Sequence, residues 1–200
     1  MSYHEVYRCK EYTIYENNLA DDFKYSVKIE GYYGIKCIVQ FPDEINGLTV
    51  TEIGKSAFWG NTRIKQIMLP ENLTKISEFA FRESGLICVK FPQNLSEIGY
   101  GSFAKCSNLI EVKFNDNIEK IGDYAFEFCI KLEKISFPES LKSIGRSAFN
   151  ECVKLNQIIF NESLEKIPEN AFSNCTKLKN IIFGDKLKEI GSSAFEGCIS

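Results

Sequence analysis

The chain has 200 residues, which is enough for one globular domain or one repeat array with a sizeable core. Hydrophobic residues make up 44% and charged residues 26%, as in ordinary soluble proteins. The net charge of -3 argues against a dedicated nucleic-acid-binding protein, and no segment approaches the roughly 20 apolar residues that cross a bilayer.

Residues 1–49 differ from the rest of the chain and are predicted to form an irregular N-terminal cap with β-strands and a hairpin. Residues 1–10 are polar and lack a signal-peptide pattern. A cytosolic protein, a removed signal and another export route all stay open. Alternation predicts a strand over residues 25–31, and residues 35–41 resemble the strand end of a degenerate repeat. Asn46-Gly47 is typical of a tight hairpin.

Residues 50–200 repeat with a period of 23 residues, apart from a single 22-residue step near Ser84-Gly85. The clearest column contains Phe58, Phe81, Phe103, Phe126, Phe149, Phe172 and Phe195. A fixed period of this length is typical of stacked repeats that bury a core only together. The region is therefore predicted to be a solenoid of six and a half to seven units, of which the last is incomplete.

Each unit is predicted to contain a strand, a bend and a compact turn. The segment L-x-x-I-x-F, as in Leu132 to Phe137, predicts a half-buried strand whose residue between Ile and Phe faces outward. The A-F-x-x-C segment is too short for a long helix and predicts a helical turn or a 3₁₀ piece. Bends are predicted at Gly99, Gly122, Gly145 and Gly191, because glycine tolerates positive φ; Ser77 and Pro168 replace this glycine in two copies, so a positive φ is not obligatory there.

One repeat position holds Cys106, Cys129, Cys152, Cys175 and Cys198. We interpret this column as buried free thiols that act as small apolar residues. Disulfides would leave at least one of the five unpaired, and a straight column does not surround a zinc ion tetrahedrally. Cys88 lies off the column and is expected to face outward as the candidate reactive thiol.

We predict no catalytic, cofactor-binding or metal-binding residues. His4 is the only histidine and lies far from the repeats, so no Ser-His-Asp or Cys-His pairing is available there. No glycine-rich phosphate-binding motif occurs either. The chain is therefore expected to bind a partner and not to act as an enzyme.

The repeat unit appears as LKSIGRSAFNECVKLNQIIF and in part as LKEIGSSAFEGC. These segments resemble the BspA-like class of leucine-rich repeats, and IVQFPDEINGLTVTEIGKSAF is similar to the family's entry into its array. The resemblance implies a right-handed leucine-rich-repeat solenoid. A parallel β-sheet would form its concave face, with short strands and 3₁₀ or helical turns on the convex side. It further implies a role at the surface of a microbe or protist, in adhesion to host proteins or to other cells.

The outward positions of the predicted concave sheet are the candidate protein-binding site. Apolar side chains recur there among lysines, a combination that suits an acidic protein partner or a self-association surface. The predicted binding residues are Met68, Ile87, Lys90, Ile110, Lys113, Lys134, Ile159 and Ile182.

The predicted function is a non-catalytic protein-interaction module, adhesin-like or surface-associated, with a protein ligand and no nucleic acid or membrane insertion. An intracellular scaffold and a structural fragment of a longer array are the alternatives. The chain reaches Ser200 partway through a unit, which predicts an open end with Ile190, Phe195 and Cys198. A longer natural chain, self-association through this end and a truncated gene product are the three interpretations. Cell-surface localisation follows only from the resemblance, and a cytoplasmic location stays open.

Overall fold

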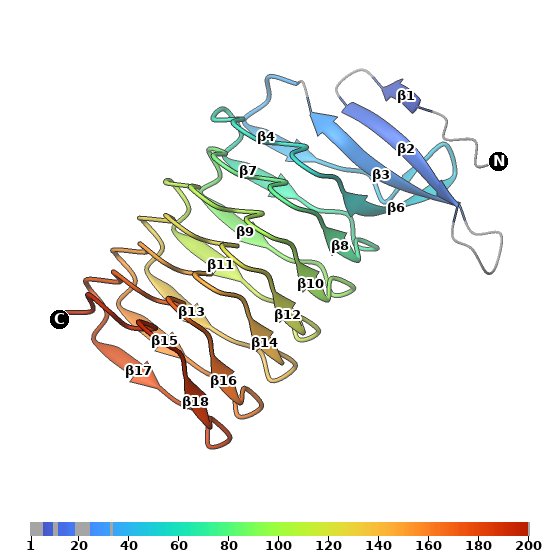
Figure 1. Ribbon diagram of the computed structural model, residues 1–200. Helices are drawn as coiled ribbons and strands as arrows, with labels where there is room; N and C mark the ends of the chain where they lie inside the picture. The colour runs from blue at the N-terminus through green and yellow to red at the C-terminus, as the bar shows by residue number, and fades with distance from the viewer. Residues whose placement is uncertain (1–5, 10–11, 19–24, 33, 200) are drawn as a thin grey trace.

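The computed structural model describes residues 6–9, 12–18, 25–32 and 34–199, which form a solenoid of stacked turns (Figure 1). Each turn of the solenoid, called a rung below, contains two short strands joined by loops. The rungs follow one another from the blue N-terminal end to the red C-terminal end. Neither an α-helix nor a 3₁₀ helix occurs among these residues. The predicted repeat solenoid is confirmed.

The first strand of each rung is three residues long and lies where L-x-x-I-x-F predicts it. In β13 (Lys134–Ser136), Ile135 is buried while both neighbours are exposed, as the alternation predicts. Parallel pairing joins these strands into two sheets. One sheet contains β4 (Ile38–Gln40), β7 (Gln66–Met68), β9 (Cys88–Lys90) and β11 (Glu111–Lys113); the other contains β13, β15 (Gln157–Ile159) and β17 (Asn180–Ile182).

The second strand of each rung forms a parallel ladder on another side of the solenoid, which breaks between β14 and β16. Gly122 and Gly191 donate backbone hydrogen bonds to the preceding rung, but Pro168 at the same repeat position has no N–H to donate. The ladder consists of β6 (Leu48–Ile53), β8 (Lys75–Ile76), β10 (Glu97–Ile98), β12 (Lys120–Ile121) and β14 (Ser143–Ile144), followed by the separate pair β16 (Lys166–Ile167) and β18 (Glu189–Ile190).

The N-terminal strands extend the second ladder. Antiparallel pairing joins β1 (Val6–Cys9), β2 (Tyr12–Asn18) and β3 (Tyr25–Tyr32), and β3 then pairs in parallel with β6. The ring of Tyr32 stacks on Phe58 with 5.4 Å between centroids, so β3 covers the first rung's core. The predicted hairpin is confirmed: β5 (Glu44–Ile45) pairs with β6, and Asn46 and Gly47 have φ of 54° and 77°. The boundary after residue 49 stays a prediction, and β6 runs across it.

The A-F-x-x-C segment is not the helical turn or 3₁₀ piece that its length predicts. Tyr124 and Phe128 adopt left-handed φ of 57°, and Tyr124, Phe126 and Phe128 donate backbone hydrogen bonds to the next rung. Between them, Ala125 donates to Gly122 within its own turn. Because a helix directs its N–H groups along its own axis, it would leave none for the neighbouring rung. The alternating turn replaces the helix and continues the inter-rung hydrogen bonding between the strands.

The glycines at the bends serve close packing and not positive φ, so this prediction is wrong for Gly99, Gly122, Gly145 and Gly191. None of the four has a φ in the left-handed region. A Cβ atom at Gly122 would lie 2.9 Å from the backbone of Gly99, and one at Gly191 would lie 2.6 Å from the backbone N of Glu169. Backbones of successive rungs approach so closely here that a side chain has no room.

Two columns of phenylalanine rings fill the core. The repeat column predicted from the sequence stacks face to face; from Phe103 through Phe126 and Phe149 to Phe172, neighbouring centroids lie 5.2, 5.2 and 5.3 Å apart. A second column follows the three-residue strands and contains Phe91, Phe114, Phe137, Phe160 and Phe183. The two columns meet edge to face, which is a favoured aromatic geometry.

Candidate functional site

The candidate face is the outward side of the three-residue strands, together with the residue that precedes each strand. The structure exposes every predicted binding residue on it except Ile159, which is half-buried. Large apolar side chains therefore reach solvent on a parallel sheet, where a partner can cover them. Their exposed fractions are 42% for Met68, 41% for Ile87, 42% for Ile110 and 54% for Ile182.

The predicted binding residues form pairs and not one continuous stripe. Ile159 lies opposite Ile182 in the register of β15 and β17, and Lys90 lies opposite Lys113 in that of β9 and β11. Ile87 and Ile110 are neighbours as well, because the backbone N of Ile110 donates to the carbonyl of Ile87 at 2.8 Å.

Met68 and Lys134 lie opposite residues that were not predicted, although Met68 shares a hollow with Lys90. Met68 lies opposite Gln40, and Lys134 lies opposite Gln157. The strand ladder on this face is interrupted between β11 and β13, so the two isoleucine pairs belong to different sheets.

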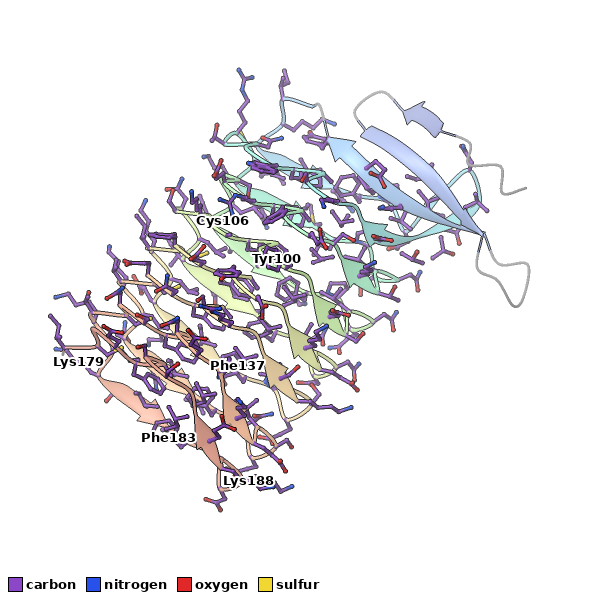
Figure 2. The ribbon with its side chains drawn as sticks, viewed as in Figure 1. Tyr100, Cys106, Phe137, Lys179, Phe183 and Lys188 are labelled. Carbon is purple, nitrogen blue, oxygen red and sulfur yellow. The ribbon has the colours of Figure 1, made fainter. Side chains whose placement is uncertain are left out.

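A hollow of about 510 Å³ lies at the beginning of β15 and β17, and Ile159 and Ile182 are the last residues of these two strands. Lys154, Lys177 and Lys179 contribute ammonium groups, and none of the three forms an ion pair with a described carboxylate. Figure 2 shows Lys179 at the edge of the C-terminal rungs. The hollow is lined by Glu133, Lys154, Asn156, Lys177, Lys179 and Asn180.

Lys154 and Lys177 were not predicted as binding residues, although the sequence carries a signal for them. Together with Lys131 they occupy one repeat position, immediately before the leucines Leu132, Leu155 and Leu178. The strand alternation selects only residues within and next to the strands, so it passes over this loop position. A second hollow, of about 470 Å³, surrounds Met68, Cys88 and Lys90 near the N-terminal end of the face.

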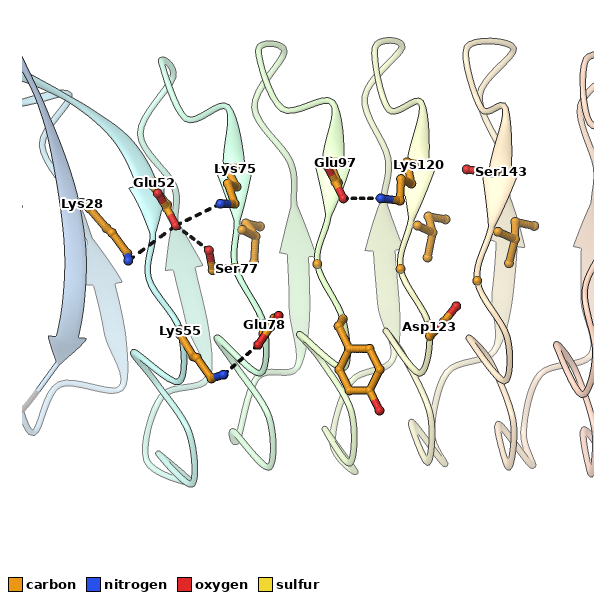
Figure 3. Close-up of a pocket in the computed structure, with 17 residues that line it drawn as sticks. Lys28, Glu52, Lys55, Lys75, Ser77, Glu78, Glu97, Lys120, Asp123 and Ser143 are labelled. Atoms are coloured by element: carbon orange, nitrogen blue, oxygen red, sulfur yellow. Dashed lines mark hydrogen bonds and ion pairs between the residues drawn. The ribbon is translucent and has the colours of Figure 1, made fainter. Parts of the chain in front are cut away.

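The outward side of the second ladder contains a groove of about 700 Å³, which Figure 3 shows in close-up. Its charges are largely paired: Lys120 Nζ lies 2.7 Å from Glu97 Oε1, and Lys55 Nζ lies 2.8 Å from Glu78 Oε2. The hydrogen bond from Lys55 lowers the pKa of Glu78. Exposed pairs of this kind add little stability and leave little free charge for a ligand. This groove is accordingly a weaker candidate than the candidate face.

Aromatic side chains also gather along the side of the solenoid that the A-F-x-x-C turns form, where the sequence predicted no site. This side is called the turn edge below. Trp59, Phe79, Tyr100 and Tyr124 come from four successive rungs and contact one another in that order. Phe79 and Tyr124 share one repeat position, whereas Trp59 and Tyr100 occupy two others, so no single column of the periodic pattern contains all four. We call these four residues the aromatic row.

The predicted burial of the cysteine column is confirmed. Cys106, Cys129, Cys152 and Cys175 are fully buried free thiols, whereas Cys198 is partly buried. The Sγ of Cys129 donates to the carbonyl of Phe103 at 3.3 Å, and later members repeat this bond one rung on. Cys88 is half-buried, which makes it less accessible than the sequence predicts.

Burial makes these thiols weak acids. Desolvation raises the pKa of Cys106 to about 11, and it raises the pKa of Cys129, Cys152 and Cys175 as well. A thiolate is the nucleophilic form of cysteine, so the column is chemically inert near neutral pH.

The thiol column predicts a loss of stability at alkaline pH. An unfolded cysteine releases its proton near pH 8.5, whereas folded Cys106 retains it up to about pH 11. The stabilisation is fully present below the unfolded pKa and is lost as the pH rises through this window. In urea titrations under reducing conditions, Cys106→Ala should lose about 1.4 kcal/mol less stability per pH unit than the wild type between about pH 9 and pH 11.

The matched control for this titration is Cys37→Ala, which removes an exposed thiol. Parallel stability curves for the wild type and Cys106→Ala across the window would contradict the prediction.

The described residues contain no group of three or more His, Cys, Asp and Glu side chains placed to hold a metal ion. His4 lies outside the described residues. In the part of the chain that the structure covers, no helix is long and apolar enough to cross a membrane.

Comparison with known proteins gives one family and several solved structures. The family model described as BspA type leucine rich repeat region matches residues 39–152 and 99–200, with six copies. A leucine-rich repeat protein from T. pallidum is 22% identical with a TM-score of 0.63, and the match covers 98% of this chain and 90% of that chain. One from Eubacterium ventriosum is also 22% identical, with a TM-score of 0.77; it covers 94% of this chain, which spans half of that protein. No curated protein matches. At these identities the structures show the fold alone.

Proposed function

We propose a function that starts from the family: the chain belongs to the BspA-type leucine-rich-repeat family. The proposed function is that of a non-catalytic module that binds an acidic protein ligand through its candidate face. The family's repeat motif is structural, so it transfers the fold and not the ligand. Stacked parallel strands offer an extended surface of the kind that repeat proteins use for binding. The ligand must therefore be inferred from the side chains of the face.

The observation that carries the proposal is the Ile159–Ile182 pair at the ends of β15 and β17, with three lysines around the beginning of the same strands that have no ion-pair partner among the described residues. An apolar centre with a charged rim is typical of a protein interface. The free ammonium groups attract carboxylates of a partner and disfavour a basic one, because unpaired like charges are costly at a contact.

An adhesin-like or surface-associated role is the setting that we propose for this binding, on the strength of the family resemblance. An intracellular scaffold with the same binding face is the alternative. Self-association is a second proposal for the partner, because exposed apolar residues of the candidate face such as Ile87 and Ile110 suit a second copy of the chain as well.

A random-sequence peptide library selected on the immobilised protein tests the acidic-ligand proposal. We expect enriched peptides to combine Asp or Glu with large apolar residues. Their affinity should fall about tenfold or more, equivalent to about 1.4 kcal/mol, for the double variant Ile159→Asp and Ile182→Asp. The same affinity should weaken as salt is raised, because exposed charges are screened.

The matched control is Ile130→Asp, which changes an isoleucine with 38% exposure that is not part of the candidate face. Enrichment of basic peptides, or equal binding by the double variant, would show the proposal to be wrong. If the double variant instead changes only the oligomeric state of the protein, the partner is a second copy of the chain.

A further inference from the structure

The aromatic row is an exposed surface that the proposed function does not use. Trp59 and Tyr100 are 51% and 42% exposed. Phe79, which lies between them, and Tyr124, which follows Tyr100, are half-buried. The row thus alternates between raised and recessed rings along the solenoid. Large aromatic side chains gathered on the surface of a soluble protein usually mark a binding site.

Contacts with neighbouring groups fix the positions of the side chains in the row. The guanidinium carbon of Arg82 lies 5.5 Å from the ring centroids of both Trp59 and Phe79. The indole N–H of Trp59 donates to Glu83 Oε2 at 3.2 Å. Gly101 leaves room for the recessed ring, because a Cβ there would lie 2.8 Å from Phe79 Cδ1. Such preorganised rings lose little entropy when a ligand binds.

A hollow of about 340 Å³ lies over the row. It is lined by Trp59, Phe79, Arg82, Tyr100, Tyr124 and Glu127. Tyr100 comes two residues after the end of β10. The hydroxyl groups of Tyr100 and Tyr124 form no hydrogen bond with any described residue, so both can donate to a ligand.

The spacing of the raised rings matches one kind of ligand. Trp59 and Tyr100 stand two rungs apart, and their ring centroids lie 5.7 Å and 5.2 Å from that of Phe79, so at most about 11 Å separates them. A polyproline II helix repeats every three residues, at about 9.3 Å. Prolines at every third position of such a helix would therefore pack next to Trp59 and next to Tyr100. Phe79 would lie beneath the residues between these two prolines.

The tilt of the rings argues against a sugar chain as the ligand. Flat stacking of successive sugar rings needs coplanar aromatic faces, but neighbouring rings of the row are inclined by 39°, 85° and 59°. A polyproline II helix presents rings on three sides and exposes its backbone carbonyls, because it has no internal hydrogen bonds. Tilted rings with two free hydroxyl donors suit that shape.

We propose that the aromatic row binds a proline-rich segment in the polyproline II conformation, with a basic residue at one end. Glu83 is neutralised by Arg82 and Lys105, but Glu127 has no ion-pair partner within the described part of the chain. Glu127 Oε1 accepts a hydrogen bond from Asn150 Nδ2 at 3.3 Å, and the negative charge that no described cation neutralises can pair with an arginine or lysine of the ligand. This site is separate from the candidate face and does not depend on its function.

Trp59 is the only tryptophan of the chain and lies in the proposed site, so its fluorescence reports binding directly. The probe is a blocked oligoproline peptide with one terminal arginine. We expect a saturable change in Trp59 emission, and no such change with a glycine-serine peptide of equal length and the same arginine. Tyr100→Ala should weaken binding about tenfold or more, because aromatic anchors dominate small interfaces.

Two controls complete the experiment. Phe128→Ala removes another exposed ring of the turn edge, and Ile182→Asp changes the candidate face; both should bind the oligoproline as the wild type does. The proposal is overturned if oligoproline gives no saturable change, or if the glycine-serine peptide binds equally well. Wild-type affinity in Tyr100→Ala, or saturation by a soluble oligosaccharide alone, would overturn it too. Tyr100 is exposed, so its removal creates no core cavity, and circular dichroism verifies that the variant is folded.

Discussion

Replacing Phe126 by Ala is expected to lower the free energy of unfolding by about 3–5 kcal/mol. The ring is fully buried and stacks between Phe103 and Phe149, with 5.2 Å to each centroid. It also meets Phe114 edge to face. Removing it leaves a cavity in the middle of the aromatic column, where the rungs on either side are fixed by their own contacts. Urea denaturation followed by circular dichroism measures the loss.

The same variant should broaden or split the unfolding transition. In a solenoid each rung contacts only its neighbours, so a weakened central contact uncouples the two halves. The matched control is Phe128→Ala on the same rung, whose ring is 38% exposed and should affect stability by no more than about 0.5 kcal/mol. If Phe126→Ala unfolds at the same urea concentration as the wild type, the register of the core is wrong.

Replacing Gly145 by Ala is expected to destabilise the protein by about 3 kcal/mol, at the upper end of the range for overpacking. A Cβ atom there would overlap the backbone N of Asp123 and the backbone C of Gly122 in the preceding rung. Backbone atoms cannot rotate away as a side chain can. The rungs would have to separate locally, which would stretch the hydrogen bonds between them. Thermal and urea denaturation give the effect.

Gly60→Ala is the matched control for this prediction. Gly60 has a left-handed φ of 69° but nothing within 4 Å of an added Cβ. Its replacement should cost only the conformational penalty of about 1–2 kcal/mol. A larger effect at Gly60 than at Gly145 would mean that backbone conformation, and not close packing, explains the glycine column.

The glycine column shows what periodicity can and cannot reveal. The sequence predicts a bend at Gly122, and a glycine alone does not distinguish positive φ from close approach. The presence of Ser77 and Pro168 at the same position already argues against a positive φ. The residues that do adopt it include Tyr124 and Glu151, whose own side chains give no sign of it. Other rungs carry glycine or asparagine at the same two repeat positions, as at Gly101 and Asn174, so the signal lies in the column and not in the single residue.

The sequence predicts which residues lie on the candidate face, but it does not predict which of them become neighbours. Strand alternation correctly predicts that Ile110 and Ile182 reach solvent, because side chains on a strand alternate between its two faces. Which residues become neighbours depends on the register between rungs and on the interruption between β11 and β13. The aromatic row was missed for another reason: Trp59 and Tyr100 each contact Phe79 from a different repeat position, and a search by columns does not compare such positions.

The near-identity of successive rungs also affects how the gene can change. From Phe103 to Phe172, each ring contact repeats the previous one within 0.1 Å in centroid distance and within 6° in interplanar angle. The thiol hydrogen bonds of Cys129, Cys152 and Cys175 repeat at 3.3 Å. Loss or duplication of one 23-residue unit by recombination between repeats would join surfaces that already fit. The length of the array is therefore free to vary during evolution, while each rung–rung contact is preserved.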